Sequence, residues 1–439
     1  MKKKNHINIG IIGLGSVGLE VVKLLFKNYS LINQKAGVKI VLKKVCDIDK
    51  SKFTIFKRKG FNTAVTTKYK EIIADKEIDI VVELIGGYHP PKEIIIESIK
   101  KGKHIVTANK AVLAKYWNEI FSFAYKNKVL VYFEASVGAG IPIIQAINEG
   151  LAANRINAIV GILNGTSNYI LTQMSKKNVP FDVALKRAKE AGFAETNPYF
   201  DIKGIDTLHK LIILGSIAFG TQLKLEDAYC EGIDGISPVD IEYGKKQFGY
   251  TLKLLGILRR KNNLVELRVH PAFLPADSLL SDVDNEFNAI YVESDTAGPT
   301  LYYGKGAGAM SAASGVVSDI IFIAQKVNKE VAGEIPYILC TPGKNVSITN
   351  INRIETNYYI RFTAIDKPGV LSQISGVLGK NNVSISAVYQ KGRKTLRDVP
   401  IIMTTHLARE GNLKKALSHI DKLPIIKRKT VFIRIEERK

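Results

Sequence analysis

Two lysine residues are placed where they could polarise a carbonyl oxygen or transfer a proton. Lys110 follows the strand-like run 105–107, and Lys210 lies four residues beyond Asp206 in a segment with helical spacing. α/β folds bind ligands at the carboxyl ends of their strands, where Lys110 is expected. Hydride reduction of an aldehyde needs a cation at the carbonyl oxygen and a proton donor. The two lysines therefore indicate this reaction, in either direction.

The Asp206–Lys210 pair also has a simpler interpretation as a solvated surface pair. Oppositely charged residues at this spacing share one helix face and contribute only a few tenths of a kcal/mol when exposed. The surrounding residues favour a buried helix instead, because they are apolar: Ile205, Leu208, Leu211, Ile212 and Ile213. Glu195 and Asp201 add carboxylates that could hold an ammonium group, although each could be an ordinary loop acid.

A glycine motif, Gly13-Leu14-Gly15-Ser16-Val17-Gly18, follows the apolar run 7–12 and precedes the helical segment 19–26. In this context the glycines allow a tight turn and bring backbone amides close to a pyrophosphate. The alternative is a plain glycine-rich turn. The position between a first strand and a helix favours a dinucleotide-binding site.

The end of the second expected strand bears on the choice of cofactor. Asp47 could accept the ribose 2′-hydroxyl of NAD, whereas Lys43, Lys44 and Lys50 could meet the 2′-phosphate of NADP. Asp47 could also simply cap a turn. Both cofactors remain open from these residues.

The elements that must position these residues form three regions. Residues 1–134, with 305–330, alternate strand-like and helical runs, which predicts an α/β dinucleotide-binding domain with a Rossmann-type parallel sheet. Residues 135–304 are a mixed α+β region for substrate binding, catalysis and dimerisation. After a linker at 331–354, residues 355–439 show the order βαββαβ of a ferredoxin-like fold. Within the middle region, helices are expected over 142–154 and 241–258.

Composition is ordinary for a globular protein, with 46% hydrophobic and 24% charged residues. Cys46, Cys230 and Cys340 are too scattered for a metal site or a disulfide framework and favour a reducing compartment. The chain opens without a signal-peptide pattern, and no apolar run approaches the roughly 18 residues of a membrane span. We therefore expect a cytoplasmic protein with no membrane partner.

The net charge of +22 invites an interpretation as a nucleic-acid-binding protein. The basic residues are spread along the chain, however, and do not alternate with aromatic residues. Such a surface is usually just solvated, and it attracts phosphate-bearing cofactors and carboxylate substrates. We expect no nucleic-acid partner.

Four segments resemble homoserine dehydrogenases that carry a C-terminal ACT domain. The stretch 161–171, Gly-Ile-Leu-Asn-Gly-Thr-Ser-Asn-Tyr-Ile-Leu, is similar to the substrate loop of that family, and 191–214 resembles its catalytic signature. Residues 134–142 and 306–309 match two further segments. The resemblance implies NADP- or NAD-dependent interconversion of L-homoserine and L-aspartate 4-semialdehyde, in threonine and methionine biosynthesis.

The resemblance also implies roles for individual residues. Lys210 would be the acid/base, assisted by Lys110, while Asp206 would orient Lys210 and the substrate. The substrate-binding residues would be Glu195, which would bind the ammonium group, together with Thr166, Gly165 and Asp201. The cofactor would be bound by Gly13, Leu14, Gly15, Ser16, Val17, Gly18, Asp47, Ile85, Gly86, Thr107, Lys110 and Gly308. A structural monovalent cation, Na⁺, would be held by the main-chain carbonyls of Glu134, Val137, Ala139 and Ile141. One departure is Ile48, where many relatives carry an arginine that can meet a 2′-phosphate.

The C-terminal region carries Asp366-Lys367-Pro368-Gly369-Val370-Leu371 between a strand and a helix, similar to the ligand loop of ACT domains. Amides at the helix start could meet an amino-acid carboxylate. The resemblance implies L-threonine as allosteric effector; the alternative is an inert or purely dimerising unit. A homo-oligomer, dimer or tetramer, is expected.

Other functions fit the residues less well. An aspartate-semialdehyde dehydrogenase would need a nucleophilic cysteine, and Cys230 and Cys340 lie in no such context. A non-enzymatic sensor of dinucleotide and amino acid would be marked by loss of Lys110 or Lys210, and both are present.

Overall fold

The computed structural model describes residues 5–54, 56, 63–262, 264–334, 336–338, 346–390 and 398–437. Contacts divide the chain into two compact units. The first comprises 1–157, 209–226 and 292–346, and the second comprises 158–208, 227–291 and 347–439. Cys340 and part of the expected linker lie outside the described residues.

A parallel sheet forms the centre of the first unit, as predicted. Its strand order is β3-β2-β1-β4-β5-β6, and every neighbouring pair is parallel. The strands are β1 (His6–Ile12), β2 (Lys39–Cys46), β3 (Ala64–Thr66), β4 (Ile80–Glu83), β5 (His104–Thr107) and β6 (Val131–Tyr132). Because the strands are parallel, β1, β4 and β5 end at the same edge, which gathers the loops that follow them.

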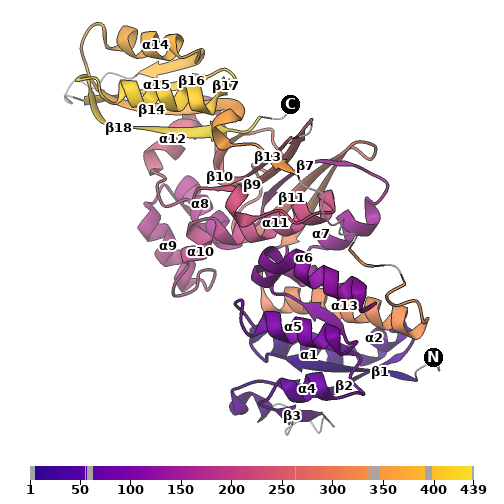
Figure 1. Cartoon of the computed structure of the whole chain (residues 1–439). Coiled ribbons are helices and arrows are strands. Elements are labelled where there is room, and N and C mark those ends of the chain that lie inside the picture. Colours follow the sequence, from indigo (N-terminus) through magenta and orange to yellow (C-terminus); the bar gives the residue numbers. More distant parts are fainter. Residues whose placement is uncertain are drawn as a thin grey trace. The chain divides into compact units, whose positions relative to one another are not determined.

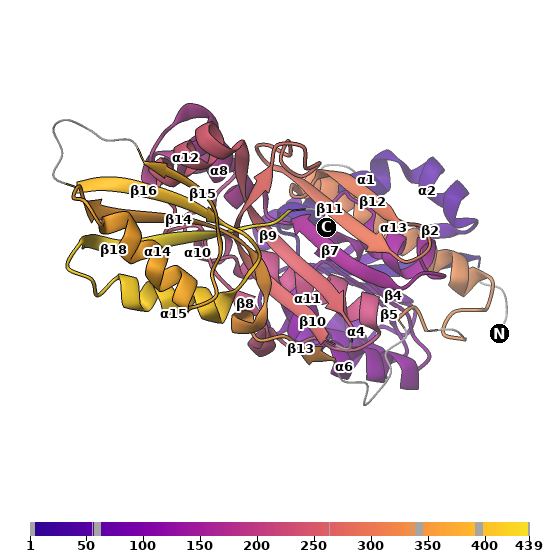
Figure 2. The same ribbon diagram turned by 90° about the horizontal axis from the view of Figure 1, so that it is seen from above.

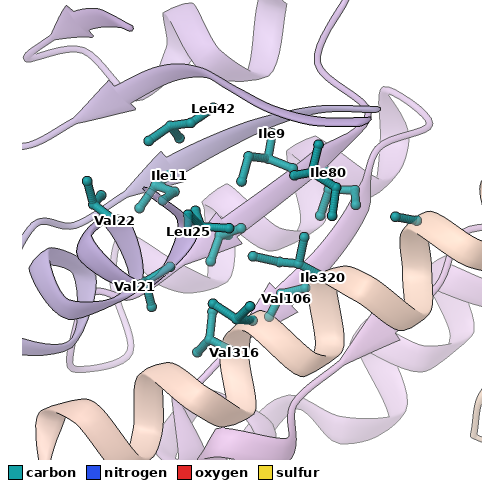
Figure 3. Close-up of a cluster of buried hydrophobic side chains, with 14 of the residues drawn as sticks. Ile9, Ile11, Val21, Val22, Leu25, Leu42, Ile80, Val106, Val316 and Ile320 are labelled. Carbon is teal, nitrogen blue, oxygen red and sulfur yellow. The ribbon is translucent and has the colours of Figure 1, made fainter. Parts of the chain in front are cut away.

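Helices between these strands complete the nucleotide-binding fold. They are α1 (Ser16–Lys27), α2 (Tyr29–Ala36), α4 (Lys70–Ala74), α5 (Pro91–Lys100) and α6 (Lys110–Lys126). A distant segment, α13 (Ala309–Asn328), packs beside α1 (Figure 1). Val316 and Ile320 of α13 face Ile9, Val21 and other apolar side chains of this core (Figure 3).

Of the helices that the structure describes, α13 is the one with the length and apolar composition of a membrane span. Half of its apolar window is buried inside the protein. Its buried face includes Val316, Val317, Ile320 and Ile323, which belong to the core of the first unit. The apolar character of α13 is therefore explained by packing within a globular fold.

The second unit is built on a mixed sheet with the order β11-β7-β9-β10-β18-β14-β16-β15 (Figure 2). Its strands are β7 (Ile156–Ile162), β9 (Tyr250–Lys261), β10 (Leu264–Pro275), β11 (Phe287–Ser294), β14 (Glu355–Ile365), β15 (Ile385–Gln390), β16 (Asp398–Thr405) and β18 (Ile426–Ile435). The helices of its first half are α8 (Gly165–Lys177), α9 (Phe181–Glu190), α10 (Tyr199–Ile202) and α12 (Pro238–Phe248). Helix α11 (Ile205–Phe219) contains the boundary between the two units.

The C-terminal module has the predicted βαββαβ order. Helices α14 (Val370–Lys380) and α15 (Glu410–Ile420) alternate with β14, β15, β16 and β18, and a short β17 (Ala408–Arg409) is added. Its own core includes Ile360, Ile374 and Leu413. The module's sheet continues into the sheet that contains β9 and β10, because β18 pairs with both β14 and β10.

Two expected helices differ from the structure. The helix expected over 241–258 ends at Phe248, where Gly249 adopts φ +67°, and β9 begins at Tyr250. Most of β9 is buried on both faces, so its apolar run has no alternation to distinguish it from a buried helix. The helix expected over 142–154 is reduced to α7 (Ile143–Gln145) and a π-helical turn, η3 (Ala146–Gly150).

Candidate active site

The loop after β1 requires glycine at two of the predicted positions. Gly13 has a φ of +100°, and a Cβ atom there would lie 2.8 Å from the carbonyl oxygen of Leu84. A Cβ atom at Gly18 would lie 2.1 Å from the carbonyl oxygen of Gly13. This packing brings α1 against the loop, so the amides at the start of α1 can approach an anion. Gly308, at the start of α13, also has a positive φ of +115°.

Asp47, at the end of β2, holds this loop in place. Its Oδ2 accepts the backbone N–H of Leu14 at 2.7 Å, and its Oδ1 accepts that of Asp49 at 2.9 Å. The ammonium group of Lys52 lies 3.1 Å from Oδ2. Burial raises the pKa of Asp47, but the hydrogen bonds from Asp49, Leu14 and Lys52 outweigh burial and lower the pKa below its usual value.

The basic residues near β2 divide into two groups. Lys43 and Lys44 form ion pairs with Asp75, at 2.8 and 3.2 Å, so their charges are directed toward α4 and its C-terminal turn. Lys52, which was not among the predicted cofactor-binding lysines, lies instead at Asp47. The side chain of Ile48 is 89% exposed. Lys52 is therefore the lysine beside the carboxylate that could meet a ribose.

A buried carboxylate, Glu83, lies at the ends of β4 and β5. One of its oxygens accepts the hydroxyl of Thr107 at 2.6 Å, and the other accepts the N–H of Ile85 at 2.6 Å. Burial raises the pKa of Glu83 to about 7, against the two hydrogen bonds. Glu83 was not predicted as a site residue, although an acidic residue that ends an apolar strand is a usable signal.

Asn109 shapes the start of the helix that begins with Lys110. Its side-chain oxygen accepts the N–H of Val112 at 3.2 Å, which caps α6. Its Nδ2 donates to the carbonyl oxygens of Ile85 and Gly87, at 2.9 and 2.8 Å. Lys110 is half-buried and directly follows Asn109, which contacts the predicted cofactor residues Thr107 and Ile85.

In the second unit, Asn164 brings two acidic side chains together. Its Nδ2 donates to Asp201 Oδ1 at 2.7 Å and to Asp206 Oδ2 at 2.9 Å. Its Oδ1 accepts the N–H of Ser167 at 2.8 Å and caps α8. Asn164 belongs to the predicted substrate-loop segment but had no predicted role, although an asparagine before a helix is a recognisable cap signal.

Helix α11 carries Asp206 and Lys210 one turn apart, as their spacing predicts. Both side chains are buried, with relative exposures of 5% and 7%. A surface pair would be exposed, so this observation contradicts the simpler interpretation of their spacing. Two charged side chains are not buried without a structural or chemical reason.

The remaining predicted substrate residues differ in their surroundings. Thr166 uses its hydroxyl to donate to the carbonyl oxygen of Phe193, at 2.7 Å. Gly165 begins α8, and a Cβ atom there would lie 2.7 Å from the carbonyl oxygen of Glu286. Glu195 is exposed in the loop between α9 and α10. The structure therefore joins Asp201 and Asp206 directly through Asn164, whereas Thr166 orders the loop that leads to Glu195.

The predicted cation segment has unusual backbone geometry. Gly138 and Ala139 both have positive φ, +71° and +47°. Asp319 of α13 accepts the N–H of Glu134 at 2.8 Å, and the Glu134 carboxylate accepts the N–H of Ile144 at 2.9 Å. In the part of the chain that the structure describes, no three His, Cys, Asp or Glu side chains gather as a metal site. Any ion here would depend on main-chain oxygens.

Three family models match the chain. They are described as "Homoserine dehydrogenase, NAD binding domain" over residues 13–134, "Homoserine dehydrogenase" over 142–321 and "ACT domain" over 358–425. The homoserine dehydrogenase of Neisseria gonorrhoeae is 43% identical over 98% of each chain. That of Helicobacter pylori is 44% identical over 99% of this chain and 100% of its own.

Solved structures agree. A homoserine dehydrogenase from Thiobacillus denitrificans matches with a TM-score of 0.92 and 42% identity over 98% of each chain. A hyperthermophilic archaeal homoserine dehydrogenase in complex with NADPH matches with a TM-score of 0.62 and 25% identity, covering 73% of this chain and 98% of its own. With its NAD-binding and ACT domains, this chain belongs to the homoserine dehydrogenases, which are NAD(P)-dependent oxidoreductases.

Proposed function

We propose that Lys210 is the acid/base for the interconversion of L-homoserine and L-aspartate 4-semialdehyde. The observation that carries this proposal is a lysine buried one turn after Asp206, whose carboxylate Asn164 holds beside Asp201. In the oxidative direction, the substrate hydroxyl loses its proton to the neutral Lys210 amine, and the carbon that bears this hydroxyl loses a hydride. A bound nicotinamide cofactor would supply the hydride acceptor. In reverse, the Lys210 ammonium returns the proton to the oxygen.

Asp206 and Asp201 would complete the substrate site. Their carboxylates can orient Lys210 and meet the ammonium group of the amino-acid substrate. Glu195 would contribute to the same ammonium group from its exposed loop, and Thr166 and Gly165 would line the site. Lys110 would stabilise negative charge that develops on the reacting oxygen.

The nucleotide-binding edge would accept both NAD and NADP. The glycine loop, with Leu14, Gly15, Ser16 and Val17, and the residues Ile85, Gly86, Thr107 and Gly308 would line the cofactor. Asp47 has the acceptor oxygens for a ribose 2′-hydroxyl, as in NAD. Lys52 supplies a cation at the same place and could turn to a 2′-phosphate of NADP.

The segment with Glu134, Val137, Ala139 and Ile141 fits a structural monovalent cation such as Na⁺. Carbonyl oxygens can replace the hydration shell of such an ion, and the positive φ at Gly138 and Ala139 re-aims successive carbonyls. Its function would be to stiffen this segment, not to take part in redox chemistry. We also propose a cytoplasmic homo-oligomer, dimer or tetramer.

L-threonine is the proposed effector of the C-terminal module. The loop 366–369 is exposed, and Gly369 adopts φ +85° directly before α14. Among the described residues, no side chain caps this 11-residue helix, and the amides of its first turn have no acceptor within the helix, so they are suited to meet a carboxylate. Millimolar threonine should lower the reaction rate or change the oligomeric state, and no effect on either would exclude this role.

The function is tested by mixing the purified protein with L-homoserine and either NAD or NADP. The absorbance of the reduced cofactor is expected to increase with NAD and with NADP, and only when homoserine is present. L-serine, one methylene shorter, serves as the matched control substrate and should be poorly oxidised. Equal rates with serine and homoserine would contradict the proposed substrate.

A further inference from the structure

The last strand of the chain belongs to two parts of the second unit. Within the C-terminal module, β18 is antiparallel to β14, with Arg434 opposite Tyr358. The end of β18 also runs parallel to β10 of the catalytic sheet, with Arg434 opposite Ala272 (Figure 1). The N–H of Glu436 donates to the carbonyl oxygen of Phe273 at 2.9 Å and extends this contact. Arg434 therefore lies where the two sheets join.

The guanidinium group of Arg434 connects acids from both parts. Its Nε and Nη2 donate to the two oxygens of Glu410 on α15, at 2.7 and 2.8 Å. Its Nη1 donates to Glu231 of the catalytic half at 2.8 Å. The hydroxyl of Tyr229 donates to the same Glu231 oxygen at 2.7 Å, and its ring lies 4.8 Å from the guanidinium carbon. The side chains of Arg434 and Glu410 are 1% and 0% exposed, so their bonds are sheltered from water, whereas Glu231 is 42% exposed.

Glu231 belongs to the segment 230–233, which is hydrogen-bonded to the turn between α10 and α11. Its N–H donates to the carbonyl oxygen of Val269 on β10 at 2.8 Å. On either side of it, the Cys230 thiol donates to the Lys203 carbonyl oxygen at 3.3 Å, and the Ile233 N–H donates to that of Ile202 at 2.9 Å.

Glycine residues in both the segment and the turn allow this close backbone contact. A Cβ atom at Gly232 would lie 2.4 Å from the Ile202 carbonyl oxygen. Gly204 has a φ of +77°, and a Cβ atom there would lie 3.3 Å from the Cys230 sulfur. A movement of residues 230–233 must therefore move the turn 202–204 with it, because the two backbones are in contact.

The turn 202–204 lies between Asp201 and Asp206, the two acids that Asn164 holds together. We propose that Arg434 and Glu231 are positioning residues of the substrate site. The C-terminal strand fixes Glu231, the segment 230–233 fixes the turn, and the turn sets the separation of Asp201 and Asp206. This inference rests on the proposed substrate role of these two acids. It makes the C-terminal module a structural part of homoserine binding, in addition to any effector that it binds.

The first test uses Glu231→Gln and Tyr229→Phe, which remove one charge and one hydroxyl at the partly exposed end of the chain of contacts. Each should raise the KM for homoserine about three- to tenfold, with little change in the Kd for NADPH. Hydrogen exchange should become faster at residues 199–206. Glu231→Asp, which keeps the charge, should restore part of the affinity for homoserine.

A matched control is available in the same interface. Arg361 of β14 donates to both carboxylate oxygens of Asp240 on α12, at 2.6 and 2.9 Å. This ion pair also joins the module to the catalytic half. None of the bonds described above connects it to the turn 202–204. Arg361→Gln should lower the Tm and leave the KM for homoserine unchanged. An equal rise in KM for Arg361→Gln and Glu231→Gln would overturn the proposal, since general loosening would then explain both.

The outcome also separates this inference from the proposed substrate site. If Asp206→Asn raises the KM for homoserine and Glu231→Gln does not, the positioning role is wrong and the site stands. If Asp206→Asn changes neither KM nor kcat, the site assignment fails, and the positioning role fails with it.

Discussion

Two buried asparagines, Asn109 in the first unit and Asn164 in the second, have the same local geometry and different partners. Each caps a helix through its side-chain oxygen, and each donates two hydrogen bonds from Nδ2. Asn109 donates to the backbone carbonyls of Ile85 and Gly87, whereas Asn164 donates to the carboxylates of Asp201 and Asp206.

The same side-chain type can therefore order a loop or hold two carboxylates together, depending on what the tertiary fold places opposite it. At the nucleotide-binding edge, the bonds of Asn109 hold the backbone after β4. In the second unit, the bonds of Asn164 bring together two like charges that would otherwise repel each other. The two regions should therefore respond differently to equivalent substitutions.

The largest effect is expected at the chemical step, at Lys210, which lies one turn after Asp206 on α11. Lys210→Ala removes the proposed acid/base and should lower kcat at least about a hundredfold. Because Lys210 lies outside the glycine loop, the Kd for NADPH measured by fluorescence titration should change little. Near-normal turnover by this variant would refute the assignment of Lys210.

The comparison itself is tested by making one substitution at both positions. Asn164→Ser keeps a capping hydroxyl and loses Nδ2, so the two carboxylates lose their shared donor. The KM for homoserine should rise about tenfold, in line with the cost of leaving a buried charged acceptor unsatisfied. Asn109→Ser, the matched variant, should raise the KM for the cofactor and leave that for homoserine nearly unchanged. The same pattern of KM changes in both variants would contradict the proposed difference between Asn109 at the cofactor site and Asn164 at the substrate site.

A smaller effect is expected from Glu83, whose donors are a hydroxyl and an amide. Its pKa is raised by burial from 4.5 to about 7 in the folded protein, so the folded state binds the proton more tightly than the unfolded state. The resulting contribution to stability is fully present below pH 4.5 and is lost as the pH rises through about 7. Glu83→Gln should remove this dependence, changing the stability difference from wild type by up to about 3 kcal/mol between pH 5 and pH 8.

Chemical denaturation of both proteins at several pH values measures that difference. Glu97→Gln is the control, because Glu97 is an exposed carboxylate of α5 in the same domain. A constant difference between Glu83→Gln and wild type from pH 5 to pH 8 would show that Glu83 does not titrate in this range.

The smallest effect concerns the ribose end of the cofactor. Lys52→Ala removes the ammonium group beside Asp47 and should raise the KM for NADP about threefold to tenfold, as expected for one partly exposed charge–phosphate contact. The KM for NAD should change less or fall, because Asp47 then has one fewer competing donor. Ile48→Arg, which places a second cation at this exposed position, should shift preference toward NADP. An equal change for both cofactors in Lys52→Ala would exclude a role in discrimination.

Much of the fold followed from local patterns. The alternation of strands and helices predicted the parallel sheet, the order βαββαβ predicted the C-terminal module, and the Gly13–Gly18 motif marked the loop that requires glycine. The spacing of Asp206 and Lys210 predicted their shared helix. The expected helix over 241–258 was wrong for a physical reason: an apolar run buried on both faces of a sheet has the same composition as a buried helix.

The tertiary structure decided which side chains meet. Local sequence contains the helix-cap signals of Asn109 and Asn164. Tertiary packing determines that Asn109 faces the carbonyls after β4, whereas Asn164 faces Asp201 of α10 and Asp206 of α11. Burial of Glu83 at the ends of β4 and β5 likewise depends on strands from different parts of the chain. The bond between Arg434 and Glu231 spans 203 positions, and only the pairing of β18 with β10 brings them together. Such partners are set by long-range packing, which hydrophobic periodicity and residue spacing do not specify.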